Sequence, residues 1–169
     1  MDESKKDVTI YTDGGCLGNP GPGGYGVMLR YGRHEKCLSG GFARTTNNRM
    51  EIMAAIAGLE ALKDPCRVTL HSDSKYLVDA MTQGWVRRWR ANGWKRNKKD
   101  KAVNVDLWQR LLTVCARHEV AFKWVKGHAG HPDNEACDRL ANAAAARDDL
   151  PIDEGYEQPS TGPDATALF

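Results

Sequence analysis

The apolar and polar positions of the chain divide it into stretches with strand periodicity and stretches with helix periodicity. Residues 8–12 form a β-branched and aromatic run that predicts a strand, and this strand is expected to end at Asp13, before a pair of glycines. After a turn-rich stretch, the runs 25–31 and 35–42 on either side of a Gly-Arg pair predict a β-hairpin.

The period becomes helical from Asn47 or Asn48, and the Asp-Pro pair at 64–65 ends this helix. Residues 67–72 predict the next strand, which delivers Asp73 to its carboxyl end. The elements expected after it are a helix over 74–81, a basic stretch, a helix over 105–117, a strand over 120–125, a loop over 126–131 and a helix over 133–147. Because strands joined through helices are parallel neighbours and a hairpin is antiparallel, the pattern predicts an α/β fold with a five-stranded mixed sheet.

The composition fits one compact domain, because the chain has 169 residues of which 41% are hydrophobic. The net charge of +2 hides an uneven distribution. Residues 87–101 hold eight basic side chains and one acid, a segment charge of +7, whereas residues 148–169 hold six acids and neither Lys nor Arg. This acidic tail also lacks an apolar period, so we expect it to be disordered.

Several classes of protein are excluded by the same composition. No run approaches the roughly 20 apolar residues of a membrane span, and residues 1–7 are mostly charged, unlike a signal peptide. The five cysteines are an odd number, widely spaced, and form no Cys-x-x-Cys pair, which argues against a disulfide framework and against a zinc cluster. We expect a cytoplasmic protein with reduced thiols and no membrane contact.

Four carboxylates are candidates for metal binding. Asp13 and Asp73 follow strands, and ligands of open α/β sheets collect at the carboxyl ends of the strands. Glu51 lies in the first turn of a helix, and Asp138 lies on the last helix. Convergence of these acids would cost like-charge repulsion, which a bound hard cation relieves.

Each acid also has a purely structural interpretation, which is the more common one for a single residue. Glu51 stands three residues after Asn48 and could complete a capping box, and Asp73 with the serine after it could cap the next helix. Asp13 is typical of a turn, and Asp138 could be a solvated helical charge. The joint occurrence of all four acids with distinctive neighbours favours the metal-binding interpretation.

These neighbours occur in four segments that follow one another along the chain. They are YTDGGCLGNPGPGG at 11–24, TTNNRME at 45–51, SDSKY at 72–76 and GHAGHPDNEACD at 127–138. In this order and spacing, the segments closely resemble the type 1 ribonuclease H family, and bacterial ribonuclease HI in particular. The resemblance runs from about residue 7 to residue 147 and leaves only the tail outside.

The resemblance implies a ribonuclease H-like fold with helices packed on both faces of the sheet, and a catalytic domain over residues 1–147. It also implies an endonuclease that cuts the RNA strand of an RNA/DNA hybrid by a two-metal-ion mechanism and leaves 5′-phosphate and 3′-hydroxyl ends. By position, the catalytic and metal-binding carboxylates are Asp13, Glu51, Asp73 and Asp138. Their oxygens suit Mg²⁺, as two ions with substrate, or Mn²⁺ as a substitute.

His128 stands in a Gly-rich loop, where composition alone favours a histidine with one backbone hydrogen bond. The resemblance implies a catalytic histidine here that assists either proton transfer or product release. Lys75 stands where the family is expected to have glutamine, and a lysine there could reach a phosphate. Contacts to the hybrid's minor groove and to a DNA-strand phosphate are implied for Cys16, Asn19, Thr46, Asn47 and Asn48.

The basic stretch at 85–101 corresponds to the family's basic protrusion. An amphipathic helix with its tryptophans in the core would explain the pattern, and so would binding of a duplex backbone. The two interpretations are compatible, with Trp85 packed inward. The residues implied to contact the duplex are Trp85, Arg88, Trp89, Lys95, Lys98 and Lys99.

Two other functions are consistent with parts of the pattern. A transposase-like or structure-specific DNA nuclease would share the fold, but Asn47, Asn48 and the basic stretch argue for a hybrid substrate. A non-catalytic module that binds hybrids or double-stranded RNA is disfavoured, because acids without metal would repel phosphate. We therefore expect a monomer whose partner is the RNA/DNA hybrid.

Overall fold

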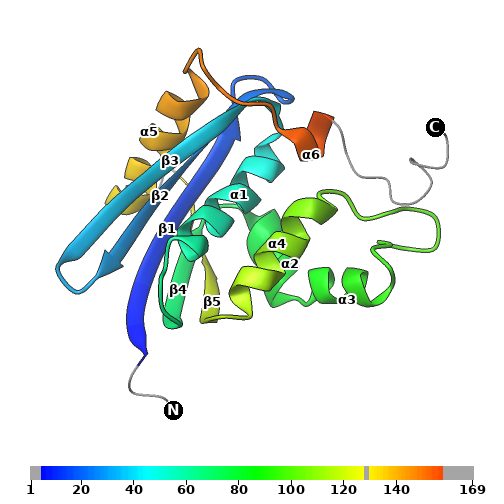
Figure 1. Cartoon of the computed structure of the whole chain (residues 1–169), viewed down its shortest axis with the longest axis horizontal. Helices are drawn as coiled ribbons and strands as arrows, with labels where there is room; N and C mark the ends of the chain where they lie inside the picture. Colours follow the sequence, from blue (N-terminus) through cyan, green and yellow to red (C-terminus); the bar gives the residue numbers. More distant parts are fainter. Residues whose placement is uncertain (1–4, 128–129, 158–169) are drawn as a thin grey trace.

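The structure is a computed structural model that describes residues 5–127 and 130–157. Its strands are β1 (Lys6–Cys16), β2 (Gly21–Tyr31), β3 (His34–Thr45), β4 (Cys66–Ser72) and β5 (Glu119–Trp124). The helices in these ranges are α1 (Asn47–Glu60), α2 (Lys75–Thr82), α3 (Trp85–Ala91), α4 (Val105–Cys115), α5 (Pro132–Ala145) and α6 (Glu154–Glu157). The five strands form one sheet in the order β3-β2-β1-β4-β5 (Figure 1). Neighbours are antiparallel from β3 to β1 and parallel from β1 to β5.

Helices cover both faces of this sheet, as predicted (Figure 1). α5 packs on one face against β1, β2 and β3, and α1 packs on the other face against β1 and β2. α4 packs against α1, so α1 is enclosed between the sheet and a second helix. The α/β class and the mixed five-stranded sheet are thereby confirmed.

α1 is almost wholly buried, because it packs on the sheet with one side and on α4 with the other. Every side chain from Arg49 to Ile56 is buried. Such a helix is expected to be apolar all round, yet Arg49 and Glu51 in its first turns are only 2% and 8% exposed. A buried charge is costly unless it is paired or binds a cation, so both residues need partners.

β1 is longer than the sequence predicts. Its parallel ladder with β4 ends at Thr12 opposite Ser72, but its antiparallel ladder with β2 continues to Cys16 opposite Gly23. The expectation that the strand ends at Asp13 is therefore wrong. The two glycines after it have low strand propensity, but pairing with β2 keeps them in the sheet. Asp13 instead marks the point where β1 loses its parallel neighbour.

The chain after α5 also differs from its prediction. The sequence predicts disorder over residues 148–157, but residues 150–157 pack against the body, with the short helix α6 and with Asp153 only 5% exposed. The prediction relied on the missing apolar period, whereas the anchor is polar, because Asp153 binds Thr45 and Arg49. The rest of the predicted tail, 158–169, lies outside the described residues.

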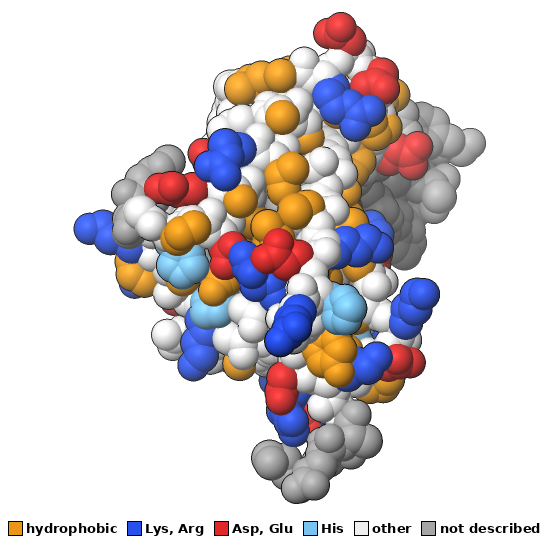
Figure 2. All heavy atoms as spheres, turned by 90° about the vertical axis from the view of Figure 1, so that its left-hand side faces the viewer, with side chains coloured by type: hydrophobic (Ala, Val, Ile, Leu, Met, Phe, Trp, Pro, Cys, Tyr) orange, Lys and Arg blue, Asp and Glu red, His pale blue; other side chains and the backbone are white. Residues whose placement is uncertain are grey.

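The surface carries charge of both signs. On the face turned to the viewer in Figure 2, Lys and Arg side chains are interspersed with Asp and Glu side chains. The basic stretch is at the other end of the molecule, on and after α3, at the right of Figure 1. None of the helices in the described ranges is long and apolar enough to cross a membrane.

α5 reaches the sheet through a close backbone contact. A Cβ atom at Gly26 of β2 would lie 2.3 Å from the carbonyl oxygen of Cys137, so only glycine fits there. This approach sets the position of Asp138, the residue that follows Cys137 on α5. The buried apolar residues on the same helix are all small: Cys137, Ala141, Ala144 and Ala145.

We expect Gly26→Ala to lower the free energy of unfolding by about 1 to 3 kcal/mol, because α5 must move away from β2 to make room for a methyl group. Chemical denaturation measures this change. Gly15→Ala is the matched control, since its Cβ would make only an ordinary contact, 3.8 Å from Asn47 Oδ1. Equal stability of the two variants would contradict the packing argument.

Candidate metal centre and surrounding cleft

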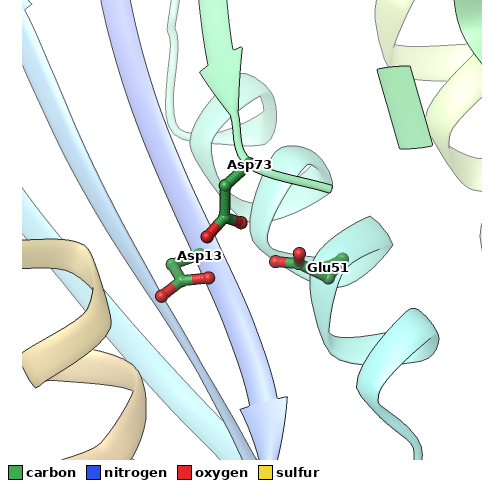
Figure 3. Close-up of side chains that lie close together, drawn as sticks. All are labelled: Asp13, Glu51 and Asp73. Atoms are coloured by element: carbon green, nitrogen blue, oxygen red, sulfur yellow. The ribbon is translucent and has the colours of Figure 1, made fainter. Parts of the chain in front are cut away.

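Three carboxylates from three different elements meet at one edge of the sheet. Asp13 comes from β1, Glu51 from α1, and Asp73 from the residue after β4. One oxygen atom of each lies within 4.8 Å of the other two. Figure 3 shows the three side chains pointing toward one another. The structure thus brings together three of the four acids that the sequence singles out.

The register of two parallel strands places the two aspartates. β1 and β4 are paired from their first residues up to Thr12 opposite Ser72. The next residue of each strand is an aspartate, so Asp13 and Asp73 leave the parallel ladder at the same level. Because both strands point the same way, their carboxylates reach the same edge of the sheet.

A direct backbone contact between β1 and α1 places the glutamate. A Cβ at Gly14 would lie 2.4 Å from the carbonyl carbon of Met50 and 2.6 Å from the nitrogen of Glu51. Only glycine permits this approach, and Gly14 directly follows Asp13. The glycine therefore lets α1 come close enough for Glu51 to join the aspartates.

The helix caps lie on neighbouring residues rather than on the acids. Thr46 caps α1 and Ser74 caps α2, each hydroxyl accepting a hydrogen bond from the backbone N–H three residues further on, at 3.2 and 3.1 Å. The capping box of Asn48 with Glu51 is therefore wrong, whereas the cap expected from Asp73 and the serine after it is present in Ser74. Neither Glu51 nor Asp73 has a capping role that would explain its place in the cluster.

The cluster is electrostatically unfavourable without a cation. Burial, and then the negative charges of Asp73 and Asp138, raise the pKa of Asp13 to about 8. Burial and the charges of Asp13 and Asp73 likewise raise the pKa of Glu51 well above its ordinary value. The N–H of Gly14 donates a hydrogen bond to Asp13 Oδ1 at 2.9 Å and opposes this effect only in part.

The donor atoms fit a hard divalent cation. The three converging ligands are carboxylates, whose oxygens Mg²⁺ and Mn²⁺ prefer. Glu51 Oε1 is buried and has no hydrogen-bond partner in the part of the chain that the structure describes. Such an orphaned oxygen is costly, and a cation held between Glu51, Asp13 and Asp73 would satisfy it.

The cluster borders a cleft of about 380 Å³, which also includes Asp138. Asp138 lies close enough to Asp13 to raise its pKa, so the fourth predicted acid joins the other three. Asn142 lies one helical turn after Asp138 and also lines the cleft. Asn142 is not among the site residues predicted from the sequence, although a spacing of four residues puts its side chain and that of Asp138 on one helix face. The other lining residues are Asp13, Gly14, Gly15, Asn47, Asn48, Glu51, Asp73 and Ala141.

The residues predicted to contact the minor groove and a phosphate lie in or beside this cleft. Asn47 Oδ1 accepts a hydrogen bond from the backbone N–H of Cys16 at 2.8 Å, and the backbone N–H of Asn47 donates to Asn19 Oδ1 at 3.0 Å. These bonds hold the end of β1 and the loop after it against the first turn of α1. Asn48 lines the cleft, and Thr46 precedes α1 as its cap.

Lys75, two residues after Asp73, packs on an aromatic ring that the sequence does not predict as its partner. Its ammonium stands over the ring of Trp124, 5.0 Å from the centroid. The indole N–H of Trp124 donates a hydrogen bond to the carbonyl oxygen of Asp73 at 3.1 Å. In the sequence Trp124 resembles any aromatic residue of a strand. Its contacts are with residues far earlier in the chain, and Asp73, for example, is 51 positions away.

The basic stretch does not line the cleft. Trp85 and Trp89 of α3 pack against the core, and the ring of Trp89 lies 6.3 Å from that of Trp108. The inward packing expected for Trp85 therefore extends to Trp89. The four basic residues predicted to face phosphate are all exposed: Arg88, Lys95, Lys98 and Lys99.

The predicted catalytic histidine, His128, lies outside the described residues. The residue before it, Gly127, is close to the cluster, since a Cβ there would lie 2.8 Å from Asp73 Oδ2. The loop between β5 and α5 therefore borders the metal centre at Gly127.

A family model described as RNase H matches residues 5–146 of this chain. The chain belongs to the RNase H family. The matched range contains the four carboxylates and the basic stretch and ends just after α5. The resemblance found in the sequence is thereby confirmed.

Curated and solved members of the RNase H family are similar over most of the chain. Ribonuclease H of Syntrophus aciditrophicus (strain SB) is 64% identical over 154 residues, which are 91% of this chain and 89% of that protein. The crystal structure of LC9-RNase H1, a type 1 RNase H with the type 2 active-site motif, has a TM-score of 0.79 at 34% identity and covers 99% of this chain and 86% of that one. LC11-RNase H1, solved in complex with an RNA/DNA hybrid, has a TM-score of 0.60 at 27% identity, with 82% and 96% covered. These relatives support a nuclease activity for the chain.

Repulsion in the cluster should make stability depend on pH when metal is chelated. The folded protein keeps a proton on Asp13 up to about pH 8, whereas the unfolded chain loses it near the ordinary value of 3.8. The free energy of unfolding should therefore fall as the pH rises between these values. Asp13→Asn removes this titration and should be more stable than the wild type by about 1 to 3 kcal/mol at the upper end of the range.

Denaturation in EDTA across this pH range measures the difference between the two proteins. Near the lower end, where Asp13 is protonated in both states, the difference should vanish. A variant that is no more stable than the wild type at high pH would show that the carboxylates do not repel one another in the folded protein.

Proposed function

We propose that the chain is an endoribonuclease that hydrolyses the RNA strand of RNA/DNA hybrids with divalent metal and leaves 5′-phosphate and 3′-hydroxyl ends. The observation that carries this proposal is the cluster of Asp13, Glu51 and Asp73, whose ionised form a bound cation would stabilise. The match to the RNase H family over residues 5–146 supports the activity. The RNA/DNA hybrid bound to LC11-RNase H1 supports the substrate.

We assign the metal site to Asp13, Glu51, Asp73 and Asp138, with Mg²⁺ as the ion, two ions in the presence of substrate, and Mn²⁺ as a substitute. Two bound ions would supply activation of the attacking water and neutralisation of charge on the leaving oxygen. Asp13 would contribute to the binding of both ions, because Asp73 and Asp138 lie close enough for their charges to act on it.

The neighbouring residues would bind and orient the hybrid. Asn47, Asn19 and the backbone at Cys16 form one hydrogen-bonded group beside the cleft and would contact the minor groove, where 2′-hydroxyls distinguish RNA from DNA. Lys75 would contact a phosphate close to Asp73. His128 is the residue we expect to assist proton transfer or product release.

The remaining substrate contacts would come from the basic stretch and from the end of the loop before α1. Thr46 with Asn19 would bind a phosphate of the DNA strand, and Asn48 would contact the minor groove from the cleft wall. The exposed basic residues Arg88, Lys95, Lys98 and Lys99, with the partly exposed rings of Trp85 and Trp89, would hold the duplex backbone. We further propose that the protein acts as a cytoplasmic monomer, and its five free cysteines support a reducing compartment.

The cleavage assay that tests this function compares three labelled substrates: RNA/DNA hybrid, double-stranded RNA and double-stranded DNA. With Mg²⁺ the wild type should cut only the RNA strand of the hybrid, and with chelator it should cut nothing. Asp73→Asn should lower the hybrid cleavage rate by about 100-fold or more, because it removes a charge from the metal site.

Asp79→Asn is the matched control, because it removes an acid from α2 that is not among the converging carboxylates. Its cleavage rate should equal that of the wild type. The proposed function fails if the wild type leaves the hybrid intact with Mg²⁺, or if Asp73→Asn cuts it at the wild-type rate.

We expect the basic stretch to cause much of the dependence of the hybrid Kd on salt concentration. Replacing Arg88, Lys95, Lys98 and Lys99 together by Ala should weaken binding and flatten the slope of log Kd against log salt by up to about one unit per lost phosphate contact. Fluorescence anisotropy with labelled hybrid in chelator measures this slope without cleavage. A triple variant of exposed basic residues outside the stretch, Lys36, Lys63 and Arg117, should keep the wild-type slope. An unchanged slope in the fourfold variant would exclude the stretch from phosphate contact.

A further inference from the structure

A buried network of charges connects the chain after α5 to the helix that carries Glu51. Arg49 of α1 donates hydrogen bonds to Asp153 from Nε at 2.7 Å and from Nη2 at 2.9 Å. It also donates to Asp106 of α4, from Nη1 at 2.8 Å and from Nη2 at 2.7 Å. Thr45, at the end of β3, donates its hydroxyl to Asp153 Oδ2 at 2.6 Å. One guanidinium thus joins α1, α4 and the C-terminal chain, and Asp153 joins β3 to them.

We call residues 150–157 the C-terminal strap, because they cross from α5 over β3 to the start of α1 (Figure 1). The carbonyl of Pro151 accepts a hydrogen bond from the backbone N–H of Ala43 in β3 at 2.7 Å. The ring of Tyr156 lies 5.8 Å from the guanidinium of Arg44. A Cβ at Gly155 would lie 1.9 Å from Asp106 Oδ2, so the strap backbone lies directly on the ion pair. The strap is therefore fixed along its length.

The first turns of α1 are held between this strap and β1. Arg49 stands two residues before Glu51, and the backbone of Met50 and Glu51 lies against Gly14 of β1. Asp13, the neighbour of Gly14, is the partner of Glu51 in the carboxylate cluster. A shift of α1 away from the strap would therefore change the distance between Glu51 and Asp13.

The chemistry of the network indicates that it positions α1 rather than adding net stability to the fold. A buried ion pair is often no more stabilising than well-packed apolar side chains, because desolvation offsets the attraction. A bidentate (two-pronged) contact between a guanidinium and a carboxylate does, however, fix the orientation and the distance of the two groups relative to each other. Arg49 makes two such contacts, one to Asp153 and one to Asp106, and is 2% exposed.

We propose that Asp153 is a positioning residue for the metal site: through Arg49 it fixes the start of α1, and so sets the separation of Glu51 and Asp13 on which metal affinity depends. The C-terminal strap is then a working part of the active site, although it follows the catalytic domain in the chain. This inference rests on the proposed function for its effect on cleavage, but its effect on metal binding stands independently.

The experiment compares Asp153→Asn with the wild type by calorimetric titration of Mg²⁺ alone, and by cleavage of the hybrid over a range of Mg²⁺ concentrations. Asp153→Asn should raise the Kd for Mg²⁺ by about tenfold and raise the half-saturating Mg²⁺ concentration for cleavage to the same degree. Excess Mg²⁺ should restore most of the cleavage rate, and the melting temperature of each variant without metal shows separately whether it is folded.

Glu154→Gln is the matched control, since it removes a neighbouring acid that is exposed and outside the network. Its Kd for Mg²⁺ should equal that of the wild type.

Two further variants test the same network. Arg49→Lys keeps the charge but loses the two-pronged contacts, so its Kd for Mg²⁺ should rise as in Asp153→Asn. Thr45→Val removes only the hydroxyl that binds Asp153 and should give a smaller change in the same direction, which provides a test even if the charge variants fold poorly.

The inference is overturned if Asp153→Asn or Thr45→Val lowers the melting temperature while the Kd for Mg²⁺ stays at the wild-type value, because the network would then serve stability alone. A wild type that binds Mg²⁺ but does not cut the hybrid would refute the proposed function instead. In that case the calorimetric comparison still decides whether Asp153 positions the metal site.

Discussion

Repulsion among the carboxylates of Asp13, Glu51 and Asp73 is the constraint on which the rest of the structure depends. The groups would separate if the chain allowed it, since burial and neighbouring negative charge disfavour the ionised forms of Asp13 and Glu51. They are held together because each belongs to a different rigid element, and those elements meet through paired strands and through backbone contact at Gly14. The fold thus keeps the three carboxyl groups close together before any cation arrives, so little rearrangement is needed when one binds.

Much of this arrangement could be predicted from the sequence, because it follows from local patterns. The apolar runs before Asp13 and Asp73 identify two neighbouring strands, and the aspartates that follow them reach the same edge. The extension of β1 to Cys16 could not be predicted in this way, because pairing with β2 overrides the low strand propensity of glycine. Propensity describes an isolated stretch, whereas the partner strand decides where the element ends.

The C-terminal strap was missed for a different physical reason. Disorder is inferred from a lack of apolar periodicity, but Asp153 is held by a charged partner 104 residues earlier in the chain. Such a pair leaves no local signal, because each residue alone resembles an ordinary surface charge. The helical period of α1 does contain a hint, since Arg49 lies among residues that must be buried on a helix enclosed by the sheet and α4. A charge in that position requires an opposite charge from elsewhere in the chain.

The strap also affects whether a strand of another molecule can pair with the edge of the sheet. β3 is an edge strand, and the outer side of an edge strand presents backbone groups to which a foreign strand can add. Pro151 occupies one of these groups by accepting the N–H of Ala43, and Glu35 and Lys36 place charges at the other end of the strand. The edge is therefore blocked at one end by the chain itself and at the other by charge. A short acidic segment after the last large helix thereby covers part of the outer side of β3, where a foreign strand could otherwise add.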